Sequence, residues 1–456
     1  MSARLSEATL AQAPDEVIRP TYDRADLSAG IVHLGPGAFH RAHQAPFTED
    51  AVLAAGGDWG IAGVSLRHGA IRDALAPQDL LYAVEVLGGP VRVIGVLRAA
   101  LVAPETPTAV AAALASPTTH IVSLTITEAG YCLTAAGELD LTHPDIAHDL
   151  AAAIPRSAIG WLARGLAERR RSGAGPVTIV SCDNLIGNGA RLKAAVGAFA
   201  ERIDRTLPAW IAASAAFPSS MVDCITPATD DRHRARVAAA LDLEDAASVQ
   251  REAFAQWAIE DHFAGPRPAW ERAGVEIVAN VADHERLKLH VLNAAHSALA
   301  YLGLARGLEF MREAIGDPDL AAFANAMIAE EVAPALPGLA VAPYWRVVRD
   351  RLANPRLDHR LGQIGEDGSA KLAQRILPIL IANARAGRSC GRLAAAVRAW
   401  LTAAGQGRVR DAQSKALTDW FRSGARLPEA LDDLRLFPEP FRAEPNVRAA
   451  MLQGAP

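Results

Sequence analysis

The chain has 456 residues, half of them hydrophobic, and a formal net charge of −5 at pH 7. This length predicts two or three domains at roughly 150 residues each, and a near-neutral charge without a long basic run argues against nucleic-acid binding. No stretch reaches the roughly 18–20 uncharged apolar residues of a membrane span, and the N-terminal residues lack the apolar core of a signal peptide, so we expect a cytoplasmic protein with no membrane partner.

Short apolar runs alternate with helical patterns over the first half of the chain. This alternation predicts an α/β, Rossmann-like N-terminal domain, residues 1–280, with a mostly parallel sheet. The strand candidates are Ile31–Leu34, Ile61–Leu66, a hairpin of Leu81–Val86 and Val91–Val96, His120–Thr127 and Val177–Ser181, and helical patterns include Thr108–Ala115 and Ile159–Arg171.

From about Glu285 onward the chain consists of successive amphipathic helical patterns, with almost no strand signal. Breaks fall at residues 316–318, 335–338 and 354–355, where Gly, Pro or Asn interrupts the pattern. We therefore predict a mainly α-helical C-terminal domain, residues 281–456.

The first strand candidate ends in Gly35-Pro36-Gly37, followed by a helical pattern that begins at Ala38 and Phe39. A strand, a Gly-x-Gly turn and a helix form the dinucleotide-binding turn of a Rossmann unit. The third glycine of the full fingerprint is replaced by His40. By itself, this segment fits an ordinary strand-to-helix turn equally well.

The end of the second strand candidate carries Arg67 and His68, where a Rossmann site usually has an acidic residue for the adenosine ribose. Arg67 is suited to binding a 2′-phosphate or to stacking on adenine. An arginine in a solvated loop without a ligand is an equally good interpretation. These residues therefore leave the choice between NAD and NADP open; we expect NAD, with NADP not excluded.

Four polar residues share one face of the helical pattern at 285–297. At about 100° per residue, Glu285 lies about 60°, His296 about 80° and Asn293 about 140° from Lys288. A lysine base, an amide donor, a histidine and a carboxylate are the groups that oxidation of a secondary alcohol needs. The competing interpretation is a solvated face of an amphipathic helix.

A metal site has little support in the sequence. His40 and His43 are three residues apart, but no spacing suggests a third ligand and no HExxH motif is present. The four cysteines are scattered without a CxxC pair, which argues against disulfides and cysteine-ligated zinc.

Several longer stretches resemble the mannitol dehydrogenase family of polyol-specific long-chain dehydrogenases, over roughly residues 30–380. They are GPGAFHRAH from Gly35, WGIAGVSLR from Trp59, TITEAGYC from Thr125, SCDNLIGNG from Ser181, FPSSMVDCITPAT from Phe217, and the K-x4-N-x2-H signature of Lys288, Asn293 and His296. The resemblance implies a zinc-independent, nicotinamide-dependent oxidoreductase.

The resemblance also implies a role for individual residues. Lys288 matches the family's general acid/base, Asn184 and Asn293 its oxyanion-binding pair, and Glu285 a proton-relay glutamate. His296, Val222 and Asp223 match residues that line the substrate site, with Asp223 near substrate or cofactor. Gly35, Gly37, Ala38 and Phe39 match the dinucleotide turn, whereas Arg67 departs from members that carry an acidic residue there.

Two substrate classes stay open, linear sugar acids and free polyols. The stretches starting at Phe254, His296 and Asn354 resemble the fructuronate reductase (D-mannonate oxidoreductase) branch, which favours D-fructuronate/D-mannonate over oxidation of a hexitol or pentitol. The basic residues His359, Arg360, Lys371 and Arg375 are candidates to bind a sugar-acid carboxylate, or they are solvated helix charges. A cofactor-binding protein without catalysis is a remote alternative, and we expect a monomer or small homo-oligomer.

Overall fold

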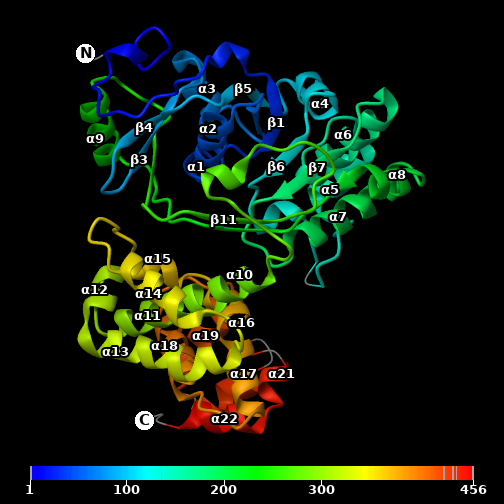
Figure 1. Cartoon of the computed structure of the whole chain (residues 1–456). Coiled ribbons are helices and arrows are strands. Elements are labelled where there is room, and N and C mark those ends of the chain that lie inside the picture. Colours follow the sequence, from blue (N-terminus) through cyan, green and yellow to red (C-terminus); the bar gives the residue numbers. More distant parts are fainter. Residues whose placement is uncertain (1–2, 135, 425–426, 434–435, 438, 454–456) are drawn as a thin grey trace. The chain divides into compact units, whose positions relative to one another are not determined.

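The computed structural model describes residues 3–134, 136–424, 427–433, 436–437 and 439–453 (Figure 1). The chain divides into two compact units, Met1–Ala282 and Asp283–Pro456. The first unit is α/β and the second is helical, so the predicted fold class is confirmed.

The first unit is built on a six-stranded sheet in which every neighbouring pair is parallel. In spatial order its strands are β5 (Leu97–Val102), β2 (Gly60–Ser65), β1 (Ala29–Leu34), β6 (Ile121–Leu124), β7 (Val177–Ser181) and β8 (Ala215–Ala216). From β1 the chain proceeds to β2 and then β5 on one side of the sheet, and it returns to β6 on the other side of β1. This reversal places a topological switch point beside β1, where Rossmann-type sheets bind nucleotides.

Helices cover both faces of this sheet because its strands are apolar on both sides. On β1, Val32 and Leu34 pack with helices α4 (Pro107–Ala115), α6 (Ala158–Ser172) and α7 (Asn188–Ile203). Ile31 points to the opposite face and packs with α2 (Gln44–Ala55). The remaining helices of this unit are α1 (Ala38–Ala42), α3 (Ala70–Leu75), α5 (Pro144–Ala151), α8 (Leu207–Ser214) and α9 (Asp231–Leu241).

Two smaller sheets complete the first unit. The predicted hairpin is present as antiparallel β3 (Tyr82–Val86) and β4 (Val91–Ile94), joined by β10 (Val249–Arg251). The second small sheet contains β9 (Ser220–Asp223), β11 (Gln256–Glu260) and β12 (Glu276–Val278). The predicted strand 91–96 is shorter than expected, because β4 ends at Ile94 and the chain then joins the large sheet as β5.

The second unit is a bundle of helices, drawn from green to red in Figure 1. The predicted break at 354–355 falls between helices, and those at 316–318 and 335–338 fall at helix ends. Its helices are α10 (Ala282–Leu287), α11 (Ala294–Ala305), α12 (Met311–Gly316), α13 (Pro318–Ala326), α14 (Val341–Leu352), α15 (Leu361–Gly365), α16 (Gly368–Arg375), α17 (Leu377–Arg385), α18 (Gly391–Gly405), α19 (Ser414–Arg422), α20 (Leu427–Asp432), α21 (Glu439–Arg442) and α22 (Pro445–Leu452).

At the centre of this unit α11 is almost entirely buried, including Ala298, Leu299 and Tyr301. The burial expected from its apolar sequence is therefore confirmed. Among the described residues, no helix combines the length and apolarity needed to cross a bilayer.

Candidate active site

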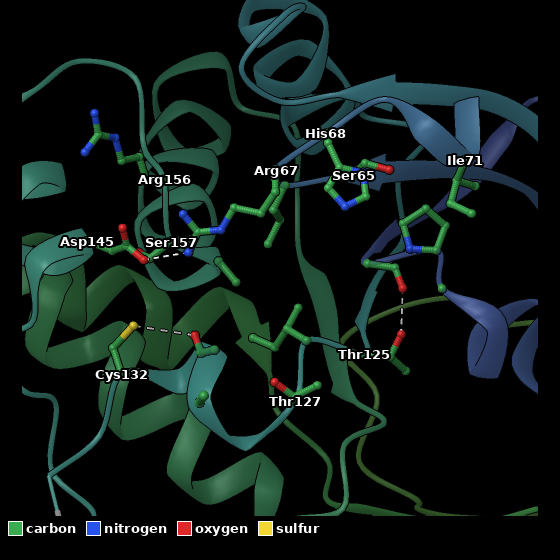
Figure 2. A pocket seen from close by; sticks show the side chains of 18 of the residues that line it. Ser65, Arg67, His68, Ile71, Thr125, Thr127, Cys132, Asp145, Arg156 and Ser157 are labelled. Atoms are coloured by element: carbon green, nitrogen blue, oxygen red, sulfur yellow. Dashed lines mark hydrogen bonds and ion pairs between the residues drawn. The ribbon is translucent and has the colours of Figure 1, made fainter. Parts of the chain in front are cut away.

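A cavity of about 610 Å³ opens at the carboxyl ends of β1, β2 and β6 in the first unit (Figure 2). Ligands of parallel α/β sheets bind at this end of the strands, beside the switch point. Its lining comes from the turn after β1, the segment after β2, the loop after β6 and the start of α5 and α6. The lining residues include Gly35, Gly37, Arg67, His68, Thr127, Cys132, His143, Asp145 and Arg156.

In the turn after β1, Gly35 occupies a position where any side chain would disrupt the structure. Its φ is +87°, and a Cβ there would lie closer than van der Waals contact to the carbonyl oxygen of Thr125. Gly37 precedes α1 and also lines the cavity. This bare backbone turn beneath an open cavity fits the pyrophosphate of a dinucleotide.

Ala38 and Phe39 lie on α1 and are not part of the cavity lining. The Phe39 ring stacks on His43, with 4.9 Å between ring centroids. His40, at the third glycine position, is buried and stacks on His33 at 3.5 Å. Ring stacking of Phe39 and His40 thus packs α1 against the protein interior. The cavity is lined by Gly35 and Gly37, which precede this helix.

The loop after β6 forms the opposite wall, although the sequence predicted a strand as far as Thr127. Thr127 has a φ of +67°, an uncommon conformation for a β-branched residue. Asp183 fixes it by accepting hydrogen bonds from the N–H groups of Ile126 at 2.9 Å and Thr127 at 2.8 Å, and from Tyr131 Oη at 2.9 Å. Burial raises the pKa of Asp183, and these donors offset that effect.

Arg67 extends from the end of β2 to Asp145 at the start of α5 (Figure 2). Its Nη2 lies 2.6 Å from Oδ2 of Asp145. The hydrogen bond from Arg67 lowers the pKa of the Asp145 carboxyl. Sequence reasoning did not identify Asp145, because nothing in the local pattern 78 residues after Arg67 indicates that the two meet.

Three other predicted residues of the first unit lie outside the described cavity lining. Val222 and Asp223 end β9 and are buried, with Asp223 opposite Gln256 of β11. Asn184 is exposed in the loop after β7. That loop is anchored by Asn188, whose amide donates to the carbonyl oxygens of Asp183 at 3.0 Å and Ser220 at 2.8 Å.

In the second unit, the predicted lysine helix contains a π-helical turn from Lys288 to Asn293, between α10 and α11. The N–H of Ala294 donates to the carbonyl oxygen of Leu289, five residues back. The expectation of a uniform 100° per residue is therefore wrong here. A π-turn holds more residues than an α-turn, so each residue advances by a smaller angle, and Asn293 returns closer to the side of Lys288 than predicted.

Glu285, Lys288 and Asn293 are each half-buried, whereas Val291 and Leu292 of the same turn are buried in the core. His296 follows one turn later on α11 and is 9% exposed. The structure thus places all four predicted polar residues in one continuous helical segment with an apolar side. π-turns occur frequently at functional sites.

His296, which is buried, belongs to a group of basic side chains in the second unit whose other members are half-buried. Its ring meets that of His359 edge to face, with 5.1 Å between centroids. Nε2 of His296 and Nδ1 of His359 have no hydrogen-bond partner among the described residues. Burial lowers the pKa of both imidazoles, and positive neighbours lower it further.

Lys371 and Arg375 on α16 contribute positive charge to this group. Burial and then Arg375 lower the pKa of the Lys371 amine. Lys371 Nζ donates to the carbonyl oxygen of Ile364 at 3.2 Å, and Arg375 Nη1 donates to Ser297 Oγ at 3.1 Å. We refer to His296, His359, Lys371 and Arg375 as the basic cluster.

Arg360, the fourth basic candidate, is directed elsewhere. Its side chain is 62% exposed and forms an ion pair with Glu309. Its guanidinium also lies over the ring of Phe310, 5.2 Å from the centroid. The structure therefore brings three of the four candidates together with His296 and leaves Arg360 at the surface.

His40 and His43, which the sequence offered as a possible pair of metal ligands, contact other protein groups. Nε2 of His43 donates to the carbonyl oxygen of Gln256 at 2.9 Å, while His40 stacks on His33. Within the described ranges, no group of three His, Cys, Asp or Glu side chains is placed to hold a metal ion.

Comparison with protein families matches both halves of the chain. Residues 29–272 match the mannitol dehydrogenase Rossmann domain, and residues 280–426 match the mannitol dehydrogenase C-terminal domain. The resemblance read from the sequence motifs is thereby confirmed.

Individual relatives cover most of the chain. It is 40% identical to mannitol 2-dehydrogenase of Phaeosphaeria nodorum over 411 residues, 87% of this chain and 72% of the relative. It is 41% identical to D-mannonate oxidoreductase of Escherichia coli over 398 residues, 84% of this chain and 82% of the relative. The structure of Pseudomonas fluorescens mannitol 2-dehydrogenase with NAD and D-mannitol superposes with a TM-score of 0.87 at 35% identity, covering 98% of this chain and 95% of that one.

Proposed function

The chain belongs to the mannitol dehydrogenase family, and we propose that it is an NAD-dependent dehydrogenase that interconverts a secondary alcohol and a ketone on a linear sugar acid. D-mannonate and D-fructuronate are the proposed pair. The observation that carries this choice is the basic cluster of the second unit.

A carboxylate matches the charge of this cluster. Lys371 and Arg375 are both half-buried, and each lowers the pKa of His296. Lysine and arginine side chains bind carboxylates through charge-assisted hydrogen bonds, which are stronger than those between neutral groups. The two unpartnered imidazole nitrogens are additional hydrogen-bonding groups for the same ligand.

Lys288 is proposed as the general base of alcohol oxidation. Its neutral amine accepts the proton of the substrate hydroxyl, and Asn293 donates to the alkoxide as negative charge develops. Bound NAD supplies the hydride acceptor. In the reverse direction the ammonium of Lys288 returns the proton to the carbonyl oxygen.

Glu285 and His296 are assigned supporting roles. Glu285 lies three residues before Lys288 and is proposed to pass the proton toward solvent. His296 is proposed to orient the substrate hydroxyl, because burial lowers the pKa of its imidazole and the neutral ring can both donate and accept. Asn184 and Asp223 stay candidate substrate contacts on the family resemblance.

Oxidation of a polyol at C2 is the second candidate. It is favoured by the similarity to the mannitol 2-dehydrogenases of Phaeosphaeria nodorum and Pseudomonas fluorescens. Because a polyol is uncharged, it would form no charge-assisted hydrogen bond with Lys371 or Arg375.

Initial rates with D-mannonate and D-mannitol, followed through NADH absorbance, test the choice. We expect kcat/KM for mannonate to exceed that for mannitol by about a hundredfold, because a site built for a charged group discriminates strongly against its absence. A preference for mannitol would replace the sugar-acid proposal by the polyol one. Absence of turnover on both substrates, with NADH still bound, would favour a non-catalytic cofactor-binding protein.

A further inference from the structure

We propose that the cavity of the first unit binds a 2′-phosphorylated adenine dinucleotide as well as the unphosphorylated one, and that Arg67 is the residue that binds the 2′-phosphate. This inference concerns the nucleotide alone. It holds or fails independently of whether the substrate is a sugar acid or a polyol.

The first argument is the position of Arg67. It lies two residues beyond the end of β2 and lines the cavity. In Rossmann units this is where the adenosine ribose binds, and an acidic residue there holds the 2′-hydroxyl. Such a carboxylate also repels a 2′-phosphate. Residues 65–69 of this chain are Ser, Leu, Arg, His and Gly, so the segment after β2 contributes no carboxylate.

The second argument is the charge of the whole lining. Two arginines, Arg67 and Arg156, are part of the cavity lining, together with His68 and His143. Among the described residues of the lining, Asp145 is the one carboxylate. Two arginines against one carboxylate suit a ligand that carries an additional phosphate.

The ion pair between Arg67 and Asp145 is the obvious objection, because it occupies the arginine. However, the Arg67 side chain is 61% exposed, and water screens such a pair strongly. The contact with Asp145 uses Nη2, whereas a guanidinium carries five N–H donors in a fixed fork. Arg67 can therefore donate to a phosphate with its remaining N–H groups and keep its hydrogen bond to Asp145, or it can give up that hydrogen bond and bind the phosphate instead.

Asp145 also explains how the unphosphorylated cofactor is accommodated. Its carboxylate is held at the cavity wall by Arg67 and by its position at the start of α5. From there it can accept a hydrogen bond from a ribose hydroxyl, which replaces the missing acidic residue after β2. The Arg67–Asp145 pair thus offers a donor for the phosphate and an acceptor for the hydroxyl.

Binding of 5′-AMP and of adenosine 2′,5′-bisphosphate to the full chain tests the inference, because the two probes differ by the 2′-phosphate. We expect calorimetric titration to show about tenfold tighter binding of the bisphosphate, equivalent to about 1.4 kcal/mol. NADP⁺ and NAD⁺ are titrated next, and NADP⁺ is expected to bind at least as tightly as NAD⁺. Added salt should weaken the bisphosphate complex more than the AMP complex.

Variants of the pair make the test specific. Arg67→Met should abolish the preference for the bisphosphate and leave AMP binding within about twofold. Asp145→Asn removes the competing carboxylate and should strengthen bisphosphate binding, a gain that misfolding cannot produce. Arg170→Met is the matched control, since Arg170 is an arginine of the same unit, paired with Asp204 and absent from the cavity lining.

Equal affinity of the wild-type chain for the two probes would overturn the inference, as would a preference that survives Arg67→Met. Weaker bisphosphate binding in Asp145→Asn would also contradict it. None of these titrations contains a sugar acid or a polyol, so failure here leaves the proposed sugar-acid activity untouched, and failure of that activity leaves these titrations unaffected.

Discussion

His296 and His359 place their imidazole rings edge to face, 5.1 Å apart between centroids, with one nitrogen of each ring unpartnered among the described residues. His296 comes from α11 and His359 from the segment before α15, so two parts of the second unit meet at this contact. Burial lowers the pKa of both rings, which are therefore neutral near pH 7. Such a pair either packs the core or binds the substrate.

Replacement of His359 by Phe separates these two roles. The phenyl ring retains the edge-to-face contact and removes the unpartnered Nδ1. If that nitrogen binds a charged substrate, KM for D-mannonate should rise by about ten- to a hundredfold, since a hydrogen bond to a charged group contributes about 1.5–3 kcal/mol. The thermal midpoint Tm should stay within about 2 °C. A large drop in Tm with unchanged KM would assign the ring to packing.

Lys371→Met and Arg375→Met test the charge of the basic cluster. Each should raise KM for mannonate by at least about tenfold through loss of a charge-assisted hydrogen bond, while the low rate with mannitol changes little. Arg349→Met is the control, because Arg349 is an exposed arginine on α14 of the same unit. Equal losses with mannonate and mannitol would contradict a carboxylate-binding role.

Lys288→Ala tests the proposed base. We expect kcat for the preferred substrate to fall by about 10²–10⁴-fold, the range of general acid–base catalysis, while NADH binding stays within twofold. Added methylamine should restore part of the rate. Lys415→Ala, at an exposed lysine on α19 of the same unit, should leave kcat unchanged. Wild-type turnover in Lys288→Ala would disprove the mechanism.

The dinucleotide turn is tested by comparing two glycines with positive φ. Gly35 has a φ of +87° and faces the carbonyl of Thr125, whereas Gly173 has a φ of +69° with nothing within 4 Å of its Cβ position. Gly173→Ala should cost about 1–2 kcal/mol for the left-handed conformation alone. Gly35→Ala adds the clash and should also weaken NADH binding at least tenfold. Similar losses in both variants would mean that close approach at Gly35 is unimportant.

The sequence predicted the parts of the fold whose signals are local. The apolar run Ile31–Leu34 ended by Gly35 is a strand followed by a turn at the cavity, and the glycine- and proline-rich breaks of the second half separate helices. Prediction from the sequence failed where contacts with residues distant in the chain determine the local structure. The run Thr125–Thr127 has high strand propensity, but Asp183 binds the N–H groups of Ile126 and Thr127 and draws this segment into a loop.

The same distinction applies to the candidate site. The residue types of the lysine helix pointed to its chemistry, but no local pattern indicated that the segment Lys288–Asn293 is π-helical. The spacing of residues also did not indicate that Arg67 reaches Asp145. Nor did it distinguish Arg360, which pairs with Glu309, from Lys371, which joins the basic cluster. Those outcomes depend on which side chains of other elements lie within reach.

The stacked pair His33 and His40 should make the stability of the first unit sensitive to acid. Burial lowers the pKa of His33 to about 3 and that of His40 well below its ordinary value. In the unfolded chain both titrate near 6.5. Below that pH the unfolded chain binds protons that the folded chain does not, so the free energy of unfolding falls as pH decreases from 6.5. At about 1.4 kcal/mol per pH unit, each histidine costs about 2 kcal/mol by pH 5.

Urea unfolding of the wild-type chain and of His40→Phe between pH 7.5 and 5 measures this contribution. The variant keeps a ring to stack on His33 and loses one titrating group, so its free energy of unfolding should fall by about 2 kcal/mol less than that of the wild type over this range. His262→Gln, at an exposed histidine, should follow the wild type. Because the remaining titrating groups are common to both chains, the difference isolates His40. Parallel curves for His40→Phe and wild type would mean that His40 takes up a proton in the folded protein as readily as in the unfolded chain.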